Sequence, residues 1–511
     1  MTTATRSATA DDAVEAGDTL ARLRAFIARH ALAEIVLLGA LIRFGTLTTQ
    51  GFWLDEQVTI SIIQRGPTDL LSTVQAGESN PALYYLLAGG WERVFGAREF
   101  GLRSLSALAG TLAIPAIYVA AASLATRRAA LIAAALTAAS PMLVWYSQEA
   151  RNYELLVLFS ALTFMCFAKA LEPRGERWLW AWALSSALAL GTHYFAIFPI
   201  AAEAAWLLAR RPGRRLDTAL PIAVVAAVEL ALLPLIASQR GHGDWIDNYD
   251  LGGRLWQVPQ HLLAGLEVPW PALPPILIAL AAAAAAYGML RATGRERRAI
   301  VIAGSIAIGA FAVLVVAALG GSDYILSRNL LGLWPPLAVG LGAALGAAGA
   351  RALGLAAAGV LCAAGVALVL WTAFTPAAQR PDYEPLAAEL AEDGVPRMIV
   401  SQTSFSSPLL LYLDGLRMAT DADLTTTELV VVEPAPTSDY AIGVCWWIAT
   451  CGNVDVEPPP PFEVPPGFTA ERSGSAGSFE YRVYTAPEPT AIERPLELFT
   501  PRVFAQAPSG G

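Results

Sequence analysis

Acidic and basic residues stand close together at a few points of an otherwise apolar chain of 511 residues, of which only 15% are charged. Asp55 and Glu56 follow a Phe-Trp-Leu step, and Glu149 and Arg151 lie two positions apart, just before Tyr153. A carboxylate can take a proton from a reacting hydroxyl, and an arginine can hold a phosphate or another anion. These pairs therefore mark where group-transfer chemistry is to be sought.

Further candidates lie at the ends of the apolar stretches. Ionisable and polar groups at such positions are costly unless they line water or a substrate. The catalytic candidates are Asp55, Glu56 and Glu149; the anion-binding candidates are Arg103, Arg151 and Arg328; the substrate-binding candidates are Asn80, Tyr84, Tyr85, Tyr153, His193 and Tyr194.

Each candidate also has an ordinary structural interpretation. Asp55 and Glu56 suit the first turn of a helix, where carboxylates favour the exposed N–H groups and the helix dipole. Glu149 and Arg151 suit an exposed ion pair, and both Arg103 and Arg328 suit charged anchors that reach out of a span end. The tyrosines and His193 suit packing or the membrane interface. The sequence leaves these alternatives open.

The elements that must position these residues are membrane helices. The mean hydropathy is +0.49, and charged clusters are separated by apolar stretches of about 17 to 24 residues, enough for a helix to cross about 30 Å of hydrocarbon. This pattern excludes a soluble enzyme and predicts an α-helical polytopic membrane protein. The eleven predicted spans lie near residues 32–49, 104–125, 129–146, 154–172, 178–192, 194–209, 217–238, 272–290, 299–319, 329–349 and 352–374.

Basic clusters fall at alternate connections between the predicted spans. Under the positive-inside rule these connections and the N-terminus are cytoplasmic, and an odd number of spans then places the C-terminal domain outside. The candidate residues all belong to the outer ends. The clusters are Arg22, Arg24 and Arg29; Arg127 and Arg128; Lys169, Arg174 and Arg177; Arg210, Arg211, Arg214 and Arg215; Arg291, Arg295, Arg297 and Arg298; and Arg351.

Residues 50–103 are predicted to form one long external loop. Its most apolar part, Pro81–Gly96, has only about eleven apolar residues before Glu92, too few for a crossing. We expect a helix on the outer membrane surface there, with Tyr84, Tyr85 and Trp91 near the headgroups. The residue 254–265 stretch of a second external loop is expected to lie along the surface in the same way.

The C-terminal quarter differs in charge from the rest. Residues 376–511 hold 19 acidic and 7 basic residues, against 24 and 27 in residues 1–375, which indicates a separate acidic domain. The predicted parts are a cytoplasmic segment 1–30, a transmembrane domain 31–375, a small external mixed α/β domain 376–486 and a flexible tail 487–511. Within the external domain we expect helices at 382–392 and 408–413, strands at 398–401, 428–433, 440–446 and 479–484, and a proline linker at 458–461.

The four cysteines divide between the two domains. Cys166 and Cys362 lie inside predicted spans, where a free cysteine behaves as a small apolar residue. Cys445 and Cys451 lie outside, six positions apart. Whether they form a disulfide stays open, because spacing does not show how close their Cβ atoms come.

Six motifs follow one another in order along residues 32–375. They are Trp-Leu-Asp-Glu, Asn-Pro-Ala-Leu-Tyr-Tyr, Leu-Arg-Ser-Leu-Ser-Ala-Leu-Ala-Gly, Ser-Gln-Glu-Ala-Arg-Asn-Tyr, Thr-His-Tyr-Phe and Arg-Asn-Leu-Leu-Gly-Leu-Trp-Pro-Pro-Leu. In this order they resemble the GT-C glycosyltransferases, in particular the branch with the protein O-mannosyltransferases and the aminoarabinose lipid A transferases. Asn80-Pro81-Ala82 departs from that branch, where many members have His-Pro-Pro.

The resemblance implies transfer of a hexosyl or pentosyl group from a polyprenyl-phosphate donor, with inversion, to a hydroxyl of a lipid, glycan or protein at the outer membrane face. Asp55 matches the family's catalytic acidic position and would be the general base, while Arg103, Arg151 and Arg328 would hold the departing phosphate. Asp55, Glu56 and Glu149 offer oxygen ligands for a divalent cation, but the resembled enzymes do not generally require one, so no cofactor is expected.

Two other functions remain open at this point. One is a transporter or flippase for a lipid-linked envelope saccharide, which Glu203 and Glu229 inside predicted spans would suit. The other is a non-catalytic assembly factor for a cell-envelope polymer. Nucleic acid is not an expected partner, because the arginine clusters are explained by membrane orientation. Loss of Asp55 would separate an enzyme from both alternatives.

Overall fold

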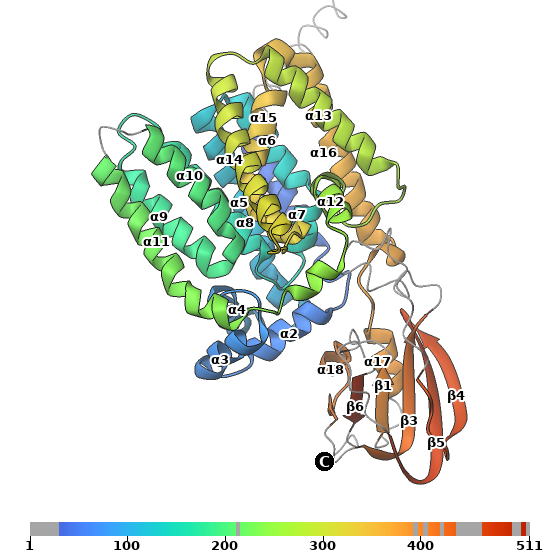
Figure 1. Ribbon diagram of the computed structural model, residues 1–511. Helices are drawn as coiled ribbons and strands as arrows, with labels where there is room; N and C mark the ends of the chain where they lie inside the picture. The colour runs from blue at the N-terminus through green and yellow to red at the C-terminus, as the bar shows by residue number, and fades with distance from the viewer. Residues whose placement is uncertain are drawn as a thin grey trace, which may run out of the picture.

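The computed structural model describes residues 30–210, 215–391, 397–401, 407–419, 424–435, 462–492 and 502–506. A bundle of helices makes up most of these residues, and a mixed sheet with two short helices lies beside one end of it (Figure 1). The predicted fold class, a polytopic helical domain with a small C-terminal α/β domain, is confirmed.

Each of the eleven predicted spans coincides with helix, although the third is broken at Ser140. By length and composition, six helices of the described chain are able to cross a membrane, or seven if α6 and α7, bent by 56°, form one span. The helices are residues 30–45, α5 (Glu99–Leu124), α6 (Arg127–Ala139), α7 (Pro141–Ser147), α8 (Tyr153–Ala170), α9 (Arg177–Thr192), α10 (Ile197–Arg210), α11 (Arg215–Ser238), α13 (Leu273–Arg291), α14 (Gly294–Leu319), α15 (Trp334–Leu345) and α16 (Arg351–Phe374).

The predicted external loop folds into three short helices, α2 (Leu54–Ile63), α3 (Pro67–Gly77) and α4 (Leu83–Phe95). At 13 residues α4 is about 20 Å long, and it is not among the candidate spans. The expected headgroup position of two of its tyrosines is wrong. Tyr84 and Tyr85 are only 1% and 0% exposed, because their face of α4 packs against Ile63 of α2 and Leu102 of α5 in one apolar cluster.

The second external loop contains η3 (Asp244–Asn248) and α12 (Leu251–Ala264). Arg254 of α12 is buried rather than exposed on a surface helix. Its guanidinium binds the carboxylate of Asp323 and donates to the Ile325 carbonyl at 2.8 Å. These bonds attach α12 to the segment that leads into η4 (Ser327–Leu333).

Two of the predicted cytoplasmic arginine clusters lie at one end of the bundle, as the prediction requires. Arg295, at the start of α14, donates to the Ser123 carbonyl at 2.9 Å, so it lies at the same end as Arg127. Arg103 lies on α5 20 residues before Ser123, so the two are about 30 Å apart along that helix. Arg127 and Arg295 therefore lie at the opposite end of the bundle from Arg103.

The C-terminal domain is a six-stranded sheet in the order β2-β6-β1-β3-β5-β4. Strand β1 runs parallel to β3 and antiparallel to β6, and alternate side chains of β1 and β3 face two apolar layers. The elements are η5 (Ala348–Ala350) and η6 (Pro376–Ala378) before the domain, then α17 (Glu384–Ala391), β1 (Arg397–Ser401), α18 (Leu409–Tyr412), β2 (Leu416–Met418), β3 (Thr425–Pro434), β4 (Thr469–Ala476), β5 (Phe479–Ala491) and β6 (Arg502–Gln506).

Most elements expected in this domain are present, and one expectation is wrong. The prediction of a flexible tail after residue 486 fails, because β5 continues to Ala491 and residues 502–506 form β6 inside the sheet. A five-residue strand between proline-containing segments is too short for a period-2 pattern to stand out. The predicted strand 440–446, the linker 458–461, Cys445 and Cys451 lie outside the described residues.

Candidate active site

Asp55 lies at the centre of a cluster assembled from three parts of the bundle. It is the second residue of α2, which begins directly after the extended residue Trp53. One oxygen, Oδ2, lies 3.5 Å from Nη1 of Arg328 and 4.0 Å from Nε of Arg151. Asp55 is 9% exposed. The predicted convergence of these three residues at one end of the bundle is therefore present in the fold.

Arg151 is held by two partners besides Asp55. Its Nη1 donates to Oε1 of Glu78 at 3.1 Å and to the Tyr85 hydroxyl at 3.0 Å. The loop between α7 and α8 thus carries a guanidinium whose position is fixed by the residue after α3 and by α4. The alternative of an ion pair between Glu149 and Arg151 is wrong, because Arg151 pairs with Glu78 instead.

Arg328 lies against aromatic rings. Its guanidinium carbon is 5.9 Å from the ring centre of Tyr153 and 6.0 Å from that of Trp245. Burial disfavours its charge, but Tyr153 and Asp55 outweigh this and raise the pKa of Arg328 above its ordinary value. Arg328 therefore stays positively charged beside Asp55. Its planar guanidinium group offers paired N–H donors of the kind that bind an anion.

Glu56 and Arg103 form a closed pair, which makes both weaker candidates for the roles predicted from the sequence. All five N–H groups of Arg103 are used: they bind both Glu56 oxygens and the carbonyls of Leu47, Gln50 and Gly51. Glu56 also accepts the Ala150 N–H at 2.8 Å and the Trp53 N–H at 3.3 Å.

Both side chains of this pair are almost fully buried, at 0% and 1% exposed. Burial by itself would raise the pKa of Glu56, but the charges of Arg103 and Arg380 and the hydrogen bonds lower it. The pair therefore has no group left for a hydroxyl proton or a phosphate. The capping interpretation of Glu56 is confirmed by its bond to the Trp53 N–H.

Glu149 pairs with an arginine that follows the last span. Arg380 donates from Nη2 to Oε2 of Glu149 at 2.7 Å and from Nη1 to the Gln148 carbonyl at 3.0 Å. Its guanidinium also lies 4.4 Å from the Trp145 ring centre. Burial, with the nearby charges of Asp55 and Glu56, raises the pKa of Glu149 to about 7 although Arg380 opposes the shift. Glu149 is thus a group that titrates near neutral pH beside Asp55.

The remaining candidates support the loops around this cluster. His193 is 3% exposed, and its Nδ1 accepts the Phe195 N–H at 3.2 Å. Burial and the charges of Arg328 and Arg151 lower the pKa of His193 to about 3, so it stays neutral. Gln239 accepts from the Tyr194 hydroxyl at 2.7 Å and donates to the Asn80 carbonyl at 3.3 Å. Asn80 and Tyr194 therefore belong to a separate group that joins the two external loops.

Among the residues described in this structure, no group of three or more His, Cys, Asp or Glu side chains is arranged to hold a metal ion. Four carboxylates (Asp55, Glu56, Glu78 and Glu149) face four guanidinium groups (Arg103, Arg151, Arg328 and Arg380). When Glu149 is protonated, this site has one net positive charge, which favours an anion.

Comparison with known proteins agrees with this architecture. Residues 79–237 match the model of the dolichyl-phosphate-mannose-protein mannosyltransferase family. The structure of ArnT from Cupriavidus metallidurans in the apo state has a TM-score of 0.56 at 14% identity, over 89% of this chain and 98% of that one. The same protein bound to undecaprenyl phosphate gives 0.54 at 14% identity, over 88% and 97%. A search of curated protein sequences found no match. The chain therefore has the fold of ArnT, and its residues 79–237 resemble the dolichyl-phosphate-mannose-protein mannosyltransferase family.

Three residues in and around this site were not predicted from the sequence. Glu78 and Gln239 lie in the external loops, and Arg380 lies in the predicted C-terminal domain. A signal was present for two of them. Glu78 is the only charged residue between Asp69 and Glu92, and Arg380 is the first basic residue after Arg351. Gln239 has no distinguishing pattern in the sequence.

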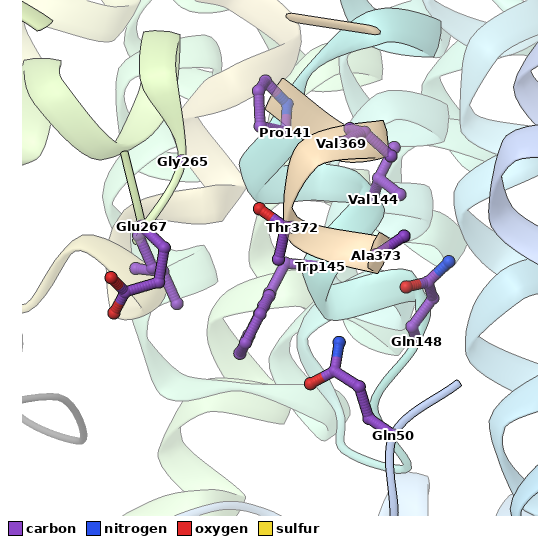
Figure 2. A pocket seen from close by; sticks show the side chains of 11 residues that line it. Gln50, Pro141, Val144, Trp145, Gln148, Gly265, Glu267, Val369, Thr372 and Ala373 are labelled. Atoms are coloured by element: carbon purple, nitrogen blue, oxygen red, sulfur yellow. The ribbon is translucent and has the colours of Figure 1, made fainter. Parts of the chain in front are cut away.

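A pocket opens beside the Glu149–Arg380 pair of the helical domain. Its lining includes Gln50, Trp145 and Gln148, with Thr372 from the end of α16 and Glu267 from the loop after α12. Figure 2 shows Glu267 on one side of these residues and Gln50 and Gln148 on the other, with the Trp145 side chain between them. Because Arg380 contacts Gln50, Trp145 and Gln148, the pocket and the site share a wall.

Proposed function

We propose that this protein transfers a sugar from a polyprenyl-phosphate donor to an acceptor hydroxyl, with Asp55 as the general base. The observation that carries the proposal is the position of the Asp55 carboxylate. Its side chain is 12% exposed and lies between Arg151 and Arg328, whereas the neighbouring Glu56 side chain is 0% exposed and is closed off by Arg103. A base must reach the acceptor hydroxyl directly, so Asp55 is the better candidate of the two.

The proposed reaction forms one bond and breaks one bond at the anomeric carbon. The acceptor oxygen attacks that carbon, its proton passes to Asp55, and the bond to the phosphate oxygen breaks with the electron pair leaving on the lipid phosphate. A single displacement of this kind inverts the anomeric configuration. The departing phosphate gains negative charge, which Arg328 is placed to stabilise because its orientation is already fixed by Tyr153 and Trp245.

The donor class is part of the proposal. ArnT of Cupriavidus metallidurans, which has the same fold, has been observed with undecaprenyl phosphate, and an isoprenoid chain would suit the apolar helices that surround the site. For this chain we propose a polyprenyl-phosphate hexose or pentose as donor, and a lipid, glycan or protein hydroxyl as acceptor.

Paired kinetics of two variants test this proposal. Asp55→Asn keeps size and most hydrogen bonding, so donor binding is expected to persist while turnover falls by roughly 100-fold or more, the usual contribution of a general base. Arg328→Ala is expected to weaken donor binding as well, because it removes charge from the phosphate position. Release of polyprenyl phosphate by purified protein, supplied with a panel of polyprenyl-phosphate sugars, measures both.

Asp69→Asn is the matched control, because Asp69 is an exposed carboxylate of the same external loop. Full turnover of Asp55→Asn with an authentic donor would refute the assigned base. A transporter or an assembly factor would also retain its role in Asp55→Asn. The carboxylate of Glu203, which suited a transporter, accepts the indole N–H of Trp182 at 2.7 Å and so has a structural partner.

We also propose that the site faces the outside of the cytoplasmic membrane, with the N-terminus in the cytoplasm. The supporting observation is that the arginine-rich end of the bundle, marked by Arg295 beside Ser123, is opposite the site. Single cysteines at positions 69 and 295, in a chain whose native cysteines are replaced by serine, test this with an impermeant thiol reagent in intact cells. Label is expected at 69; label at 295 alone would reverse the orientation.

A further inference from the structure

The four residues before Leu54, the first residue of α2, are bonded by side chains from very different parts of the chain. Gln50–Trp53 is not helical, and Trp53 is extended, so these peptide groups lack the regular partners of a helix. Arg103 donates to the carbonyls of Gln50 and Gly51, at 2.6 and 2.7 Å. The orientation of this segment therefore depends on side chains that reach it from elsewhere.

Two of these contacts come from beyond the last span. The Phe52 N–H donates to the Tyr412 hydroxyl at 2.6 Å, and the Arg380 N–H donates to Oε1 of Gln50 at 2.9 Å. Tyr412 is the last residue of α18 in the C-terminal domain. Thus the domain that contains the sheet binds the backbone three residues before the proposed base.

The Tyr412 hydroxyl is oriented for this contact. It donates its own proton to Oε1 of Glu99 at 2.7 Å, which leaves its oxygen to accept from Phe52. Glu99 is the first residue of α5, and the Tyr412 ring packs against the same apolar cluster as Phe52 and Ile60. One hydroxyl therefore joins α18, the start of α5 and the segment that leads to Asp55.

We propose that Tyr412 is a positioning residue, through which the C-terminal domain sets the direction of Asp55. This inference rests on the proposed function, in which Asp55 is the base. A general base acts only within hydrogen-bond reach of its proton, and a misplacement of about 1 Å can cost about 100-fold in rate. The external domain is on this account a part of the active site, and a change that moves α18 against the bundle changes turnover.

Tyr412→Phe in the full-length protein tests the inference, because it removes the hydroxyl and keeps the ring. Turnover is expected to fall by about 10- to 100-fold, with the donor KM changed by no more than about twofold. Hydrogen exchange of the backbone amides in residues 50–57, measured without substrate, is expected to become faster. Glu99→Ala, which frees the hydroxyl to rotate, is expected to show the same changes to a smaller degree.

The matched control is Tyr481→Phe. It removes a hydroxyl that donates to Glu389 at the same distance of 2.7 Å, but within the C-terminal domain. It is expected to leave turnover and the exchange of residues 50–57 as in the wild type. The double variant Asp55→Asn, Tyr412→Phe is expected to be no slower than Asp55→Asn alone, because Tyr412 acts only through the placement of Asp55.

The outcomes separate this inference from the proposed function. Wild-type turnover and unchanged exchange in Tyr412→Phe, with Asp55→Asn inactive, would overturn the role of Tyr412 alone. A further loss of rate in the double variant would likewise overturn it, since that would indicate a general structural defect. Full activity of Asp55→Asn would overturn the assigned base, while the exchange measurement would still report whether Tyr412 holds residues 50–57.

Discussion

Two neighbouring carboxylates on the first turn of α2 have opposite surroundings. Glu56 and Arg103, here called the closed pair, are almost fully buried and use every donor of the guanidinium. Asp55, Arg151 and Arg328, the open cluster, make longer ionic contacts of 3.5 and 4.0 Å, and their side chains are 8–12% exposed. The comparison teaches that two adjacent carboxylates on one helix turn can be held very differently: Glu56 is enclosed in short hydrogen bonds, whereas the ionic contacts of Asp55, the proposed base, are longer.

The largest expected effect tests the closed pair. Glu56→Gln leaves the buried Arg103 without a counter-charge, and breaking a buried pair in this way costs about 3–5 kcal/mol. We expect the thermal unfolding midpoint of the purified protein to drop clearly, whereas that of Asp55→Asn stays close to the wild type. Tryptophan fluorescence during heating measures both variants.

The opposite pattern would break this comparison. If Glu56→Gln unfolds like the wild type and loses turnover as Asp55→Asn is expected to do, Glu56 is the base. Replacing both partners, as Glu56→Leu with Arg103→Met, is a useful control, because an apolar pair of similar size removes the uncompensated charge and is expected to recover part of the stability.

A second prediction concerns Glu149. It is buried in an ion pair with Arg380, as Glu56 is with Arg103, but its pKa is raised rather than lowered. Its pKa is raised from 4.5 to about 7, so the folded protein holds this proton over a pH range in which the unfolded chain has lost it. Its contribution to stability therefore falls as pH rises from about 4.5 to 7, by about 3 kcal/mol for a shift of this size.

Thermal unfolding of the wild type and of Glu149→Gln, from pH 5 to pH 8, measures this contribution. The difference in midpoint between the two proteins is expected to change mainly below pH 7 and to level off above it. A difference that is constant over the whole range would show that Glu149 is ionised throughout, as a complete ion pair with Arg380. Glu149 would then belong with the closed pair.

The smallest expected effect tests how Arg328 of the open cluster contacts the donor phosphate. Arg328→Lys keeps the positive charge but loses the planar donor pair and its stacking on Tyr153 and Trp245. We expect the donor KM to rise by about 10-fold, the loss of one good charged hydrogen bond. Arg65→Lys, an exposed substitution of the same type on the residue 50–103 loop, controls for the chemical change. An unchanged KM in Arg328→Lys would exclude bidentate phosphate contact by this residue.

Several parts of the fold could be predicted from the sequence because they depend on local pattern. The apolar stretches predicted eleven helical segments at their correct places. Leu386 and Leu390, four residues apart, predicted one face of α17, and both are buried in the same cluster. The alternation of arginine clusters predicted which connections share an end of the bundle, and so brought Asp55, Arg151 and Arg328 together before any contact was known.

Other features were wrong or absent in the prediction because they depend on distant partners. The pairing of Arg103 is absent from the prediction, since its sequence context does not show that the carbonyls of Leu47, Gln50 and Gly51 turn toward it. Tyr84 and Tyr85 were placed at the headgroups, since their burial depends on how α4 packs against α2 and α5. Strand β6 was interpreted as a flexible tail because only its pairing with β1 makes it a strand.

The sequence by itself determined the class of protein, the helical segments, the charged end of the bundle and the set of polar residues at the other end. Hydrophobic length and charge distribution are properties of continuous segments, which is why they could be read along the chain. Only the tertiary structure decided that Glu56 is closed and Asp55 open, and that Arg380 and Tyr412 reach the residues before Asp55. The availability of a charged group depends on how completely its hydrogen bonds are filled, and here distant segments of the chain supply those bonds.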